Sequence, residues 1–275
     1  MTARSYLYVP GDAPDKLGKA LGRGADALIV DIEDAVPPAG KDAARAAVRA
    51  WLDAVEPGPV EIWVRVNSGE RRETDIRAVA ASPRLTGLVL AKVETAGELD
   101  VVDALLTEIG AGRLPVVPLL ESAAAVLRAP LIAAAPRVAR LQVGEADLRA
   151  DTGITPGGDE RELLWVRSQV VLASAAAGID PPVAPVSTDF RDLDALRAST
   201  LGLARLGYVG RACIHPAQIA VVNEVFTPAD DEVARARDLV TRFEAAGTGV
   251  LLDSDGRMVD EAVVRQARRI LGRAG

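Results

Sequence analysis

Acidic side chains follow several short aliphatic runs of this sequence, at the points where those runs end. Asp31 and Glu33 follow the run ALIV. Glu121 follows VVPLL, and Asp147 comes shortly after LQV. Carboxylates suit Mg²⁺ or Mn²⁺, with water and substrate completing an octahedron, and a buried excess of them is costly unless a cation neutralises it. Singly, each acid is better explained as a loop carboxylate or helix N-cap, but the repeated pattern favours a divalent-metal site.

Two basic residues accompany these acids. Arg65 stands near the end of the apolar run EIWVRV, where an arginine serves either in a core ion pair or as a bidentate clamp for a carboxylate. We favour the clamp, because a metal ion and an arginine together bind a 2-keto acid well. Lys92 offers Schiff-base chemistry as an alternative. The acids around it favour a protonated, ion-paired lysine instead.

Other candidate residues have simpler structural explanations. His215, the one histidine, is followed by Pro216 in CIHPAQ, so a structural hydrogen bond is at least as well supported as catalysis. Asp34 is placed to organise the loop into a helix that starts near Lys41. No His/Cys cluster points to zinc. The segment GITPGG lacks the spacing of a phosphate-binding glycine fingerprint and the Walker lysine.

The elements that must position these residues are short strands alternating with helices, a pattern that predicts βαβ units and a parallel sheet. The expected strands are 5–9, 27–32, 61–66, 87–92, 116–120, 140–143, 183–186 and 212–214. The expected helices include 41–52, 96–106, 122–134, 160–177 and 192–206. Eight such units favour a (β/α)₈ TIM barrel, whose active site lies at the carboxyl ends of the strands. An open doubly wound sheet stays an alternative, because periodicity does not report closure.

The pattern changes after the eighth expected strand. Pro228 opens a charged helix over about 229–246, Asp255-Gly256 marks a hairpin at 250–259, and a basic helix follows to Leu271. We therefore expect a barrel catalytic domain of residues 1–226. Residues 227–275 form a helix–hairpin–helix extension that serves as a lid or an oligomerisation segment.

Bulk composition narrows the class of protein. The chain has 275 residues of which 49% are hydrophobic, enough for one large core. Its net charge of −7 and the lack of a basic tract exclude an electrostatic nucleic-acid footprint. The absence of a long apolar run argues against a membrane span. A single cysteine and an N-terminal stretch without a secretory apolar region predict a cytoplasmic location.

Seven stretches of the chain resemble one family in their order and spacing. They are RSYLYVPGD, GADALIVDIEDAV, VRVN, AKVE, LLES, VGEADL and CIHPAQI. They resemble the citrate lyase β-subunit-like proteins of the HpcH/HpaI aldolase superfamily, which also holds malyl-CoA and citramalyl-CoA lyases. The resemblance implies a TIM-type barrel in which Glu121 and Asp147 hold Mg²⁺ or Mn²⁺. It also implies that Arg65 binds the carboxylate of the 2-keto acid.

The resemblance extends to the C-terminal stretch GRMVD. It implies that Asp260 reaches the active site of a neighbouring subunit and serves there as the acid/base, which favours the CoA-dependent branch of the family. Arg4 and Lys16, near the first strand, are the expected contacts for the phosphates of CoA. The chain departs from the family at Ala91, where a proline often precedes the lysine. In GEADL the first acid, Glu145, stands one residue early.

The implied activity is that of a stand-alone carbon–carbon lyase. It would cleave a β-hydroxyacyl-CoA of the malyl-CoA or citramalyl-CoA type into an acyl-CoA and a 2-keto acid, with condensation or thioester hydrolysis as further activities. One alternative is a citrate lyase β-subunit acting on an acyl-carrier-protein thioester, and another is a non-catalytic barrel that serves as a binding module. Because family members are commonly trimers or hexamers, we expect a homo-oligomer of that kind.

Overall fold

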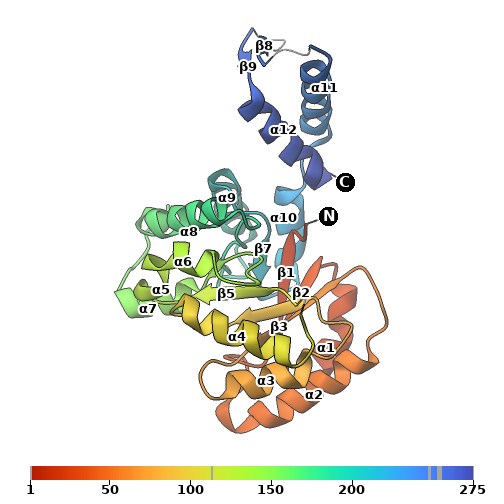
Figure 1. Ribbon diagram of the computed structural model, residues 1–275, viewed down its shortest axis with the longest axis vertical. Helices are drawn as coiled ribbons and strands as arrows, with labels where there is room; N and C mark the ends of the chain where they lie inside the picture. The colour runs from red at the N-terminus through yellow and green to blue at the C-terminus, as the bar shows by residue number, and fades with distance from the viewer. Residues whose placement is uncertain (1, 113, 247–248, 253–255, 275) are drawn as a thin grey trace. The chain divides into compact units, whose positions relative to one another are not determined.

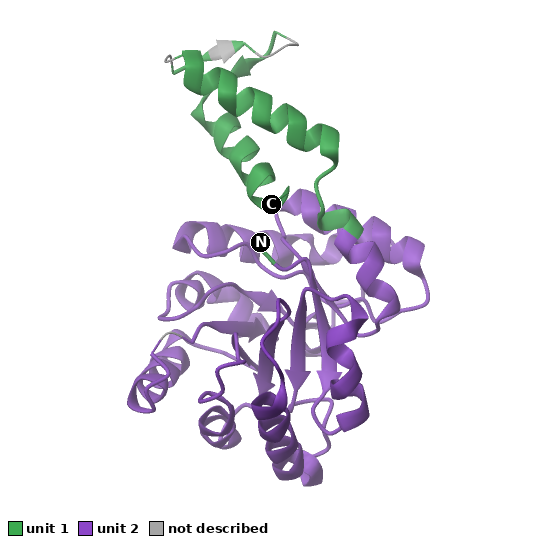
Figure 2. Cartoon of the chain, turned by 90° about the vertical axis from the view of Figure 1, so that its right-hand side faces the viewer, with its two compact units in different colours: residues 1–2, 224–275 green, residues 3–223 purple. Residues whose placement is uncertain are grey.

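The computed structural model describes residues 2–112, 114–246, 249–252 and 256–274. The chain divides into two compact units, shown in different colours in Figure 2. The larger unit is Ala3–Asn223, and the smaller one is Glu224–Gly275 together with Met1–Thr2. The two units are described separately below.

The larger unit is built on a curled sheet of seven parallel strands. They are β1 (Ser5–Pro10), β2 (Ala27–Asp31), β3 (Glu61–Val66), β4 (Gly87–Leu90), β5 (Val116–Leu120), β6 (Gln142–Val143) and β7 (Arg211–Cys213). Their order in the sheet is β6-β5-β4-β3-β2-β1-β7. Single parallel bridges join Gln142 to Val183 and Ala184 to Arg211, so residues 183–184 connect the two edges. This arrangement is consistent with a TIM-like barrel, as the sequence predicted.

The eighth predicted strand, 183–186, is reduced to these isolated bridges. Pro181 and Pro182 precede the segment and Pro185 lies inside it. A proline has no N–H to donate to a ladder, so regular pairing on both sides of this segment is lost. Residues 183–184 therefore make one bridge to each neighbouring strand and do not form a continuous strand ladder.

Helices surround the sheet, as Figure 1 shows. They are α1 (Pro14–Ala20), α2 (Lys41–Ala54), α3 (Arg71–Val79), α4 (Ala96–Glu108), α5 (Ala123–Leu127), α6 (Ala129–Ala133), α7 (Glu145–Thr152), α8 (Leu164–Ala177) and α9 (Leu193–Leu206). Helices cover the outer face of the curled sheet and side chains fill its interior, which explains why β2, ALIVD, is buried along its whole length. The helix expected at 122–134 is two helices, because Pro130 lacks an N–H donor and stands in the first turn of a new helix.

The interior of the curled sheet is filled at its amino end. Tyr6, Ile29, Trp63 and other inward-facing residues form one buried cluster. Gly87 of β4 faces Trp63, and a Cβ at that position would lie 2.3 Å from the indole ring and 2.7 Å from a backbone oxygen. A larger residue at Gly87 would therefore displace the tryptophan that fills the amino end.

The smaller unit contains α11 (Asp230–Ala246), β8 (Leu251–Leu252), β9 (Met258–Val259) and α12 (Glu261–Ala274). Strands β8 and β9 pair antiparallel, and α11 packs against α12. The turn predicted at Asp255-Gly256 lies partly outside the described residues. α10 (Ala217–Phe226) spans the boundary between the units. Within the described ranges, every helix is too short or too polar to cross a lipid bilayer.

Candidate active site

The loop after β2 is organised by Asp31, which is 2% exposed. Its carboxylate accepts the N–H of Glu33 at 2.8 Å and that of Ala35 at 3.0 Å. It also accepts from Arg65 of β3, with Nε–Oδ1 at 2.8 Å and Nη2–Oδ2 at 2.6 Å. Such bidentate, charge-assisted hydrogen bonds are strong, and they also fix the orientation of the guanidinium group. Asp31 therefore sets both the course of the loop and the orientation of the arginine.

The guanidinium of Arg65 has a second edge that Asp31 does not occupy. Nη1 lies 3.3 Å from Oε2 of Glu33 and 3.5 Å from Oδ2 of Asp34, which are long contacts. A carboxylate arriving from solvent would compete for this Nη1 edge and leave the bond to Asp31 intact. The sequence left two roles open for Arg65, a core ion pair or a carboxylate clamp. The structure allows both, because the ion pair with Asp31 uses Nε and Nη2 and leaves the Nη1 edge for a ligand.

Lys92 links the loop after β4 to the loop after β2. Its Nζ lies 2.6 Å from Oε1 of Glu33 and 3.3 Å from Oδ1 of Asp34. Partial burial lowers the pKa of the Lys92 ammonium, but the hydrogen bonds to Glu33 and Asp34 and the negative charges of these two groups together raise the pKa above its usual range. A protonated lysine is not a nucleophile, so this geometry agrees with the ion-paired interpretation and not with a Schiff base.

The backbone of Lys92 is also specialised. Its φ of 53° lies in the left-handed region, which non-glycine residues rarely adopt. In this conformation the Lys92 N–H donates to Oε2 of Glu121 at 3.0 Å. The strained residue therefore orients a candidate metal ligand with its backbone while its side chain joins the acids across the site.

Glu121, at the end of β5, is a buried carboxylate with 6% exposure. It packs against Gly144, where an added Cβ would lie 2.5 Å from the Glu121 Cγ. Burial, together with the negative charges of Glu33 and Asp147, raises the pKa of Glu121 to about 7. A carboxyl group in this environment gains from a nearby cation, which favours the ionised form.

Asp147, the second candidate ligand, lies exposed in the first turn of α7. It is close enough for its charge to act on Glu121, so the two carboxylates serve the same end of the sheet. Among the described residues, no group of three or more His, Cys, Asp or Glu side chains is arranged to hold a metal. One buried and one exposed carboxylate nevertheless fit Mg²⁺, which keeps several waters and takes one or two protein carboxylates.

Two other polar residues near the strand ends, Glu145 and Asn67, have partners away from the candidate metal pair. Glu145 accepts from Nε and Nη2 of Arg167 at 2.7 and 2.9 Å, a pair that joins α7 to α8. Asn67 donates to Asp75 at 2.7 Å and is buried. Neither residue is therefore available to the candidate metal site.

Two further residues can be assigned local contacts. His215 accepts the N–H of Ala217 through Nδ1 at 3.1 Å, a structural bond at the start of α10. Asp34 does not cap α2, whose first turn has no side-chain cap. Lys41 organises this loop instead, because its Nζ donates to the backbone oxygens of Ile32, at 3.2 Å, and Glu33.

The remaining predicted residues lie apart from the candidate metal pair. Arg4 stands at the amino end of β1, where its Nε donates to Asp26 at 2.7 Å, so the structure does not bring it to the carboxyl ends of the strands. Lys16 is exposed on α1, which follows the carboxyl end of β1. Asp260 belongs to the smaller unit, where its Oδ1 accepts two backbone N–H bonds of α12 at 2.9 and 3.1 Å.

Two polar residues beneath the site were missed by the sequence reasoning. The ring of Tyr8 lies under Arg65, with 5.1 Å between the guanidinium carbon and the ring centroid. Gln142 of β6 is 2% exposed, and its amide is near enough to act on the hydroxyl of Tyr8. The available signal was the period of two along a strand, which places Tyr6 and Tyr8 on the same inward face.

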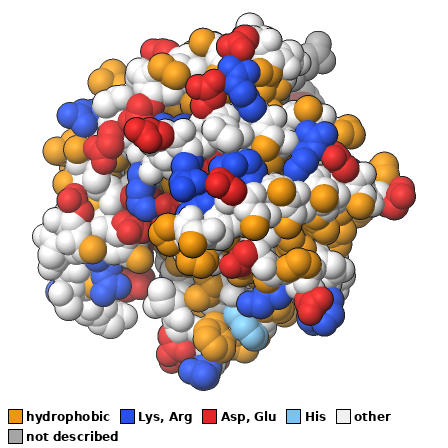
Figure 3. Space-filling view, turned by 90° about the horizontal axis from the view of Figure 1, so that it is seen from below, with side chains coloured by type: hydrophobic (Ala, Val, Ile, Leu, Met, Phe, Trp, Pro, Cys, Tyr) orange, Lys and Arg blue, Asp and Glu red, His pale blue; other side chains and the backbone are white. Residues whose placement is uncertain are grey.

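Figure 3 looks onto the molecule from below and shows basic and acidic side chains gathered around the middle of that face. The strand arrowheads of Figure 2 point toward this face, so it carries the carboxyl ends of the sheet. The mixture of charges there agrees with the ion pairs that Arg65 and Lys92 form with Asp31, Glu33 and Asp34.

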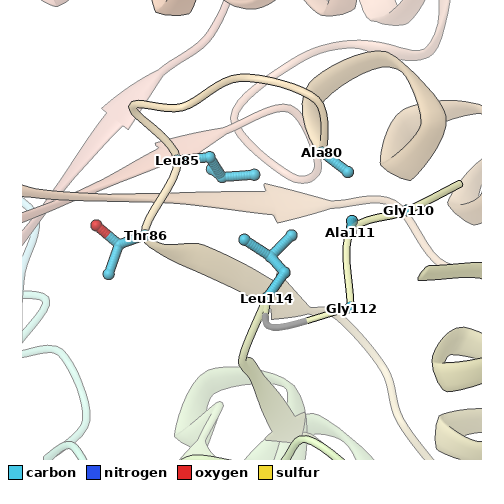
Figure 4. Close-up of a pocket in the computed structure, with 7 residues that line it drawn as sticks. All are labelled: Ala80, Leu85, Thr86, Gly110, Ala111, Gly112 and Leu114. Carbon is cyan, nitrogen blue, oxygen red and sulfur yellow. The ribbon is translucent and has the colours of Figure 1, made fainter. Parts of the chain in front are cut away.

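A separate hollow of about 580 Å³, drawn in Figure 4, lies at the other end of the sheet. Thr86 and Leu114, which line it, stand just before β4 and β5. The remaining lining residues are Ala80, Leu85, Gly110, Ala111 and Gly112. None of these side chains is ionisable, so this hollow lacks the groups that acid–base or metal chemistry needs.

Residues 4–216 match the HpcH/HpaI aldolase/citrate lyase family. A citrate lyase subunit beta-like protein of Deinococcus radiodurans is 36% identical over 279 residues, which cover 98% of this chain and 96% of that protein. An L-malyl-CoA/beta-methylmalyl-CoA lyase of Rhodobacter capsulatus is 33% identical over 301 residues, covering 98% and 94%. Protein CitE of Mycobacterium tuberculosis, crystallised with magnesium, acetoacetate and coenzyme A, is 31% identical with a TM-score of 0.78, covering 98% and 97%.

Proposed function

This chain belongs to the HpcH/HpaI aldolase/citrate lyase family, and from that premise we propose that it is a magnesium-dependent carbon–carbon lyase. The proposed substrate is a β-hydroxyacyl-CoA of the malyl-CoA or citramalyl-CoA type, cleaved to an acyl-CoA and a 2-keto acid. One observation carries the proposal. Glu121 and Asp147 stand at the same end of the sheet as Arg65, whose outer guanidinium edge makes only long contacts.

In this proposal Glu121 and Asp147 hold Mg²⁺, which supplies stabilisation of the negative charge that develops on the substrate oxygen. Arg65 holds the carboxylate of the keto acid through its Nη1 edge, while Asp31 keeps the guanidinium from turning. Lys92 neutralises part of the charge on Glu33 and Asp34. A substrate carboxylate then reaches Arg65 without meeting two uncompensated negative groups.

Cleavage moves the electrons of one C–C bond onto the thioester. The hydroxyl group loses its proton and becomes the carbonyl of the keto acid, and the thioester enolate takes a proton at its α-carbon to give the acyl-CoA. We assign this second proton transfer to Asp260 of a neighbouring subunit. The reverse sequence joins an acyl-CoA to a 2-keto acid.

The lyase assignment is tested with malyl-CoA, citramalyl-CoA and related thioesters in the presence of Mg²⁺. We expect release of glyoxylate, pyruvate or oxaloacetate that stops in a chelator and in Glu121→Gln. The free thiol of CoA is measured in parallel, because hydrolysis releases it whereas cleavage does not. Thiol release without any keto acid would replace the lyase by a thioesterase. Turnover restricted to an acyl-carrier-protein thioester would support the citrate lyase alternative.

The oligomer and the role of Asp260 are tested together. Asp260 caps α12, so the matched variants are Asp260→Asn, which keeps a good cap, and Asp260→Ala, which does not. We expect both to lose activity and only the alanine variant to lose about 1 kcal/mol of stability. Mixing Asp260→Asn with Arg65→Met subunits should restore part of the activity if the aspartate acts across a subunit boundary. An active monodisperse monomer would remove that role.

Three structural predictions belong to the same proposal. The curled sheet is taken as a complete (β/α)₈ barrel, with residues 183–184 in the position of the eighth strand. The segment from residue 227 onward is taken as the lid or oligomerisation segment of a homotrimer or hexamer. Lys16 is proposed to contact a phosphate of CoA, and Lys16→Ala should raise the KM for acyl-CoA only. Arg4 is engaged by Asp26 at the other end of β1 and is not included.

A further inference from the structure

Strand β1 carries two tyrosines that face the interior of the sheet, and each has an arginine against its ring. Tyr6 lies toward the amino end, with Arg140 5.8 Å from its centroid, and its hydroxyl accepts from Arg140 Nη1 at 2.7 Å. Tyr8 lies two residues further, with Arg65 at 5.1 Å. The two positions share one face because side chains alternate along a strand.

The two tyrosines bind their arginines differently. Tyr6 uses both its ring and its hydroxyl on the same Arg140. Tyr8 offers Arg65 its ring, and its hydroxyl lies toward the side chain of Gln142. Gln142 is 2% exposed, and its amide acts on the hydroxyl of Tyr8 across the interior.

This arrangement restrains Arg65 in two directions. Asp31 holds the Nε and Nη2 edge of the guanidinium within its plane. The ring of Tyr8 lies beneath that plane and blocks movement toward the interior. An arginine side chain carries about 2 kcal/mol of rotamer entropy, so restraint before binding lowers the cost of holding a ligand.

We propose that Tyr8, itself held by Gln142, is a positioning residue that presents the Nη1 edge of Arg65 to the carboxylate of a 2-keto acid. This inference rests on the proposed function of Arg65. It goes beyond that function by assigning a role to the tyrosine ring against which the guanidinium packs. It concerns the keto-acid half of the reaction and leaves the binding of acyl-CoA unaffected.

The test uses Tyr8→Leu, Tyr8→Phe and Gln142→Leu in the full-length protein, with Tyr6→Phe as the matched control. In the condensation direction we expect Tyr8→Leu to raise the KM for the keto acid about tenfold, because the cation–π contact is lost. The KM for acyl-CoA should stay within about twofold. Tyr8→Phe keeps the ring and should restore most of the affinity, with a loss of about two- to threefold.

Gln142→Leu removes the amide that acts on the same hydroxyl, so it should match Tyr8→Phe, and the double variant should be no worse than either single one. Tyr6→Phe should lower the melting temperature and leave both KM values unchanged. A rise in the acyl-CoA KM equal to that for the keto acid, or an effect of Tyr6→Phe on keto-acid KM, would overturn the proposal.

A crystal structure of Tyr8→Leu separates this inference from the proposed function. We expect Arg65 to lose its present orientation in that variant. An arginine that keeps both bonds to Asp31 and the same rotamer overturns the positioning role, whatever the enzyme's activity. A wild-type protein that turns over no keto acid overturns the proposed function instead, and the position of Arg65 in the variant still decides the role of Tyr8.

Discussion

The two ends of the sheet hold related assemblies of tyrosine, arginine and carboxylate. At the amino end, Arg140 is 6% exposed and pairs with Tyr6 and with Asp180. At the carboxyl end, two cations, Arg65 and Lys92, stand among five carboxylates: Asp31, Glu33, Asp34, Glu121 and Asp147. Arg140 and Asp180 balance one another in charge, whereas the cluster at the carboxyl end has an excess of negative charge. Such an excess near buried groups indicates a place prepared for a further cation.

The comparison also separates two uses of arginine. The partners of Arg140 lie within the protein, so its contribution is to stability. Arg65 is fixed along one edge and turns another toward the open face. The same side-chain types thus close one end of the interior and leave the other end ready for a ligand.

The largest expected effect comes from removing each arginine. Arg65→Met should lower kcat/KM by at least about 10³, since a charge-assisted clamp of the substrate is lost while a buried acid is left unpaired. Arg140→Met should leave turnover unchanged and cost roughly 1–3 kcal/mol of stability, because the buried hydroxyl of Tyr6 loses its partner. Steady-state kinetics and denaturant unfolding measure the two effects. If the two variants lost equal activity, the distinction between a functional arginine at the carboxyl end and a structural one at the amino end would be wrong.

The next effect is the pH dependence of stability without metal. Burial raises the pKa of Glu121 to about 7 from the usual 4.5, so the folded state binds a proton more tightly than the unfolded chain. Its contribution is fully present below about pH 4.5 and is lost as the pH rises through about 7, a change of up to about 3 kcal/mol. Glu121→Gln should flatten this slope in unfolding measurements with a chelator. An unchanged slope would show that Glu121 titrates normally.

Magnesium affinity provides a third test of the carboxyl end. Because the ion binds the ionised form of Glu121, affinity should rise about tenfold between pH 6 and pH 8. Calorimetric titration at the two pH values measures the change, with Glu145→Gln as control because Glu145 is paired with Arg167. Affinity that is independent of pH would argue against Glu121 as a ligand.

The smallest effect concerns backbone strain, which occurs at both ends. Lys92 has a φ of 53° and Arg137, just before β6, has a φ of 62°. At each position a Gly variant should be about 1 kcal/mol more stable than the Ala variant, because glycine adopts this conformation without strain. Both Lys92 variants should lose activity, whereas both Arg137 variants should keep it. Kinetics that are the same at the two positions would show that the strain at Lys92 has no functional role.

The sequence was a good guide to the order of elements and to the ends of strands. Runs such as EIWVRV and VVPLL are buried strands at the predicted positions, because an enclosed parallel sheet needs continuous apolar segments. The prolines around residues 183–186 were visible but their effect on pairing was not anticipated. Helix 122–134 was read as one element although Pro130 divides it.

Side-chain partners were harder to predict than positions. Arg65 was recognised, but its bidentate bond to Asp31 joins residues 34 apart in the chain and has no local signal. Glu145 follows a strand as the acids of the site do, yet its partner Arg167 lies on another helix, a pairing without a local signal. Tyr8 and Gln142 were missed for the same reason, since their relation exists only across the interior.

The filled amino end of the sheet has a kinetic consequence. Tyr6, Trp63 and their neighbours fill the amino end of the interior, so we expect reactants to enter and products to leave at the carboxyl end. In the proposed reaction, a small keto acid held by Arg65 then lies deeper than the larger thioester. Such a geometry predicts a compulsory order of addition and release, in which the acyl-CoA is last to arrive and first to leave. Product-inhibition patterns that are competitive only for the keto acid would reveal that order.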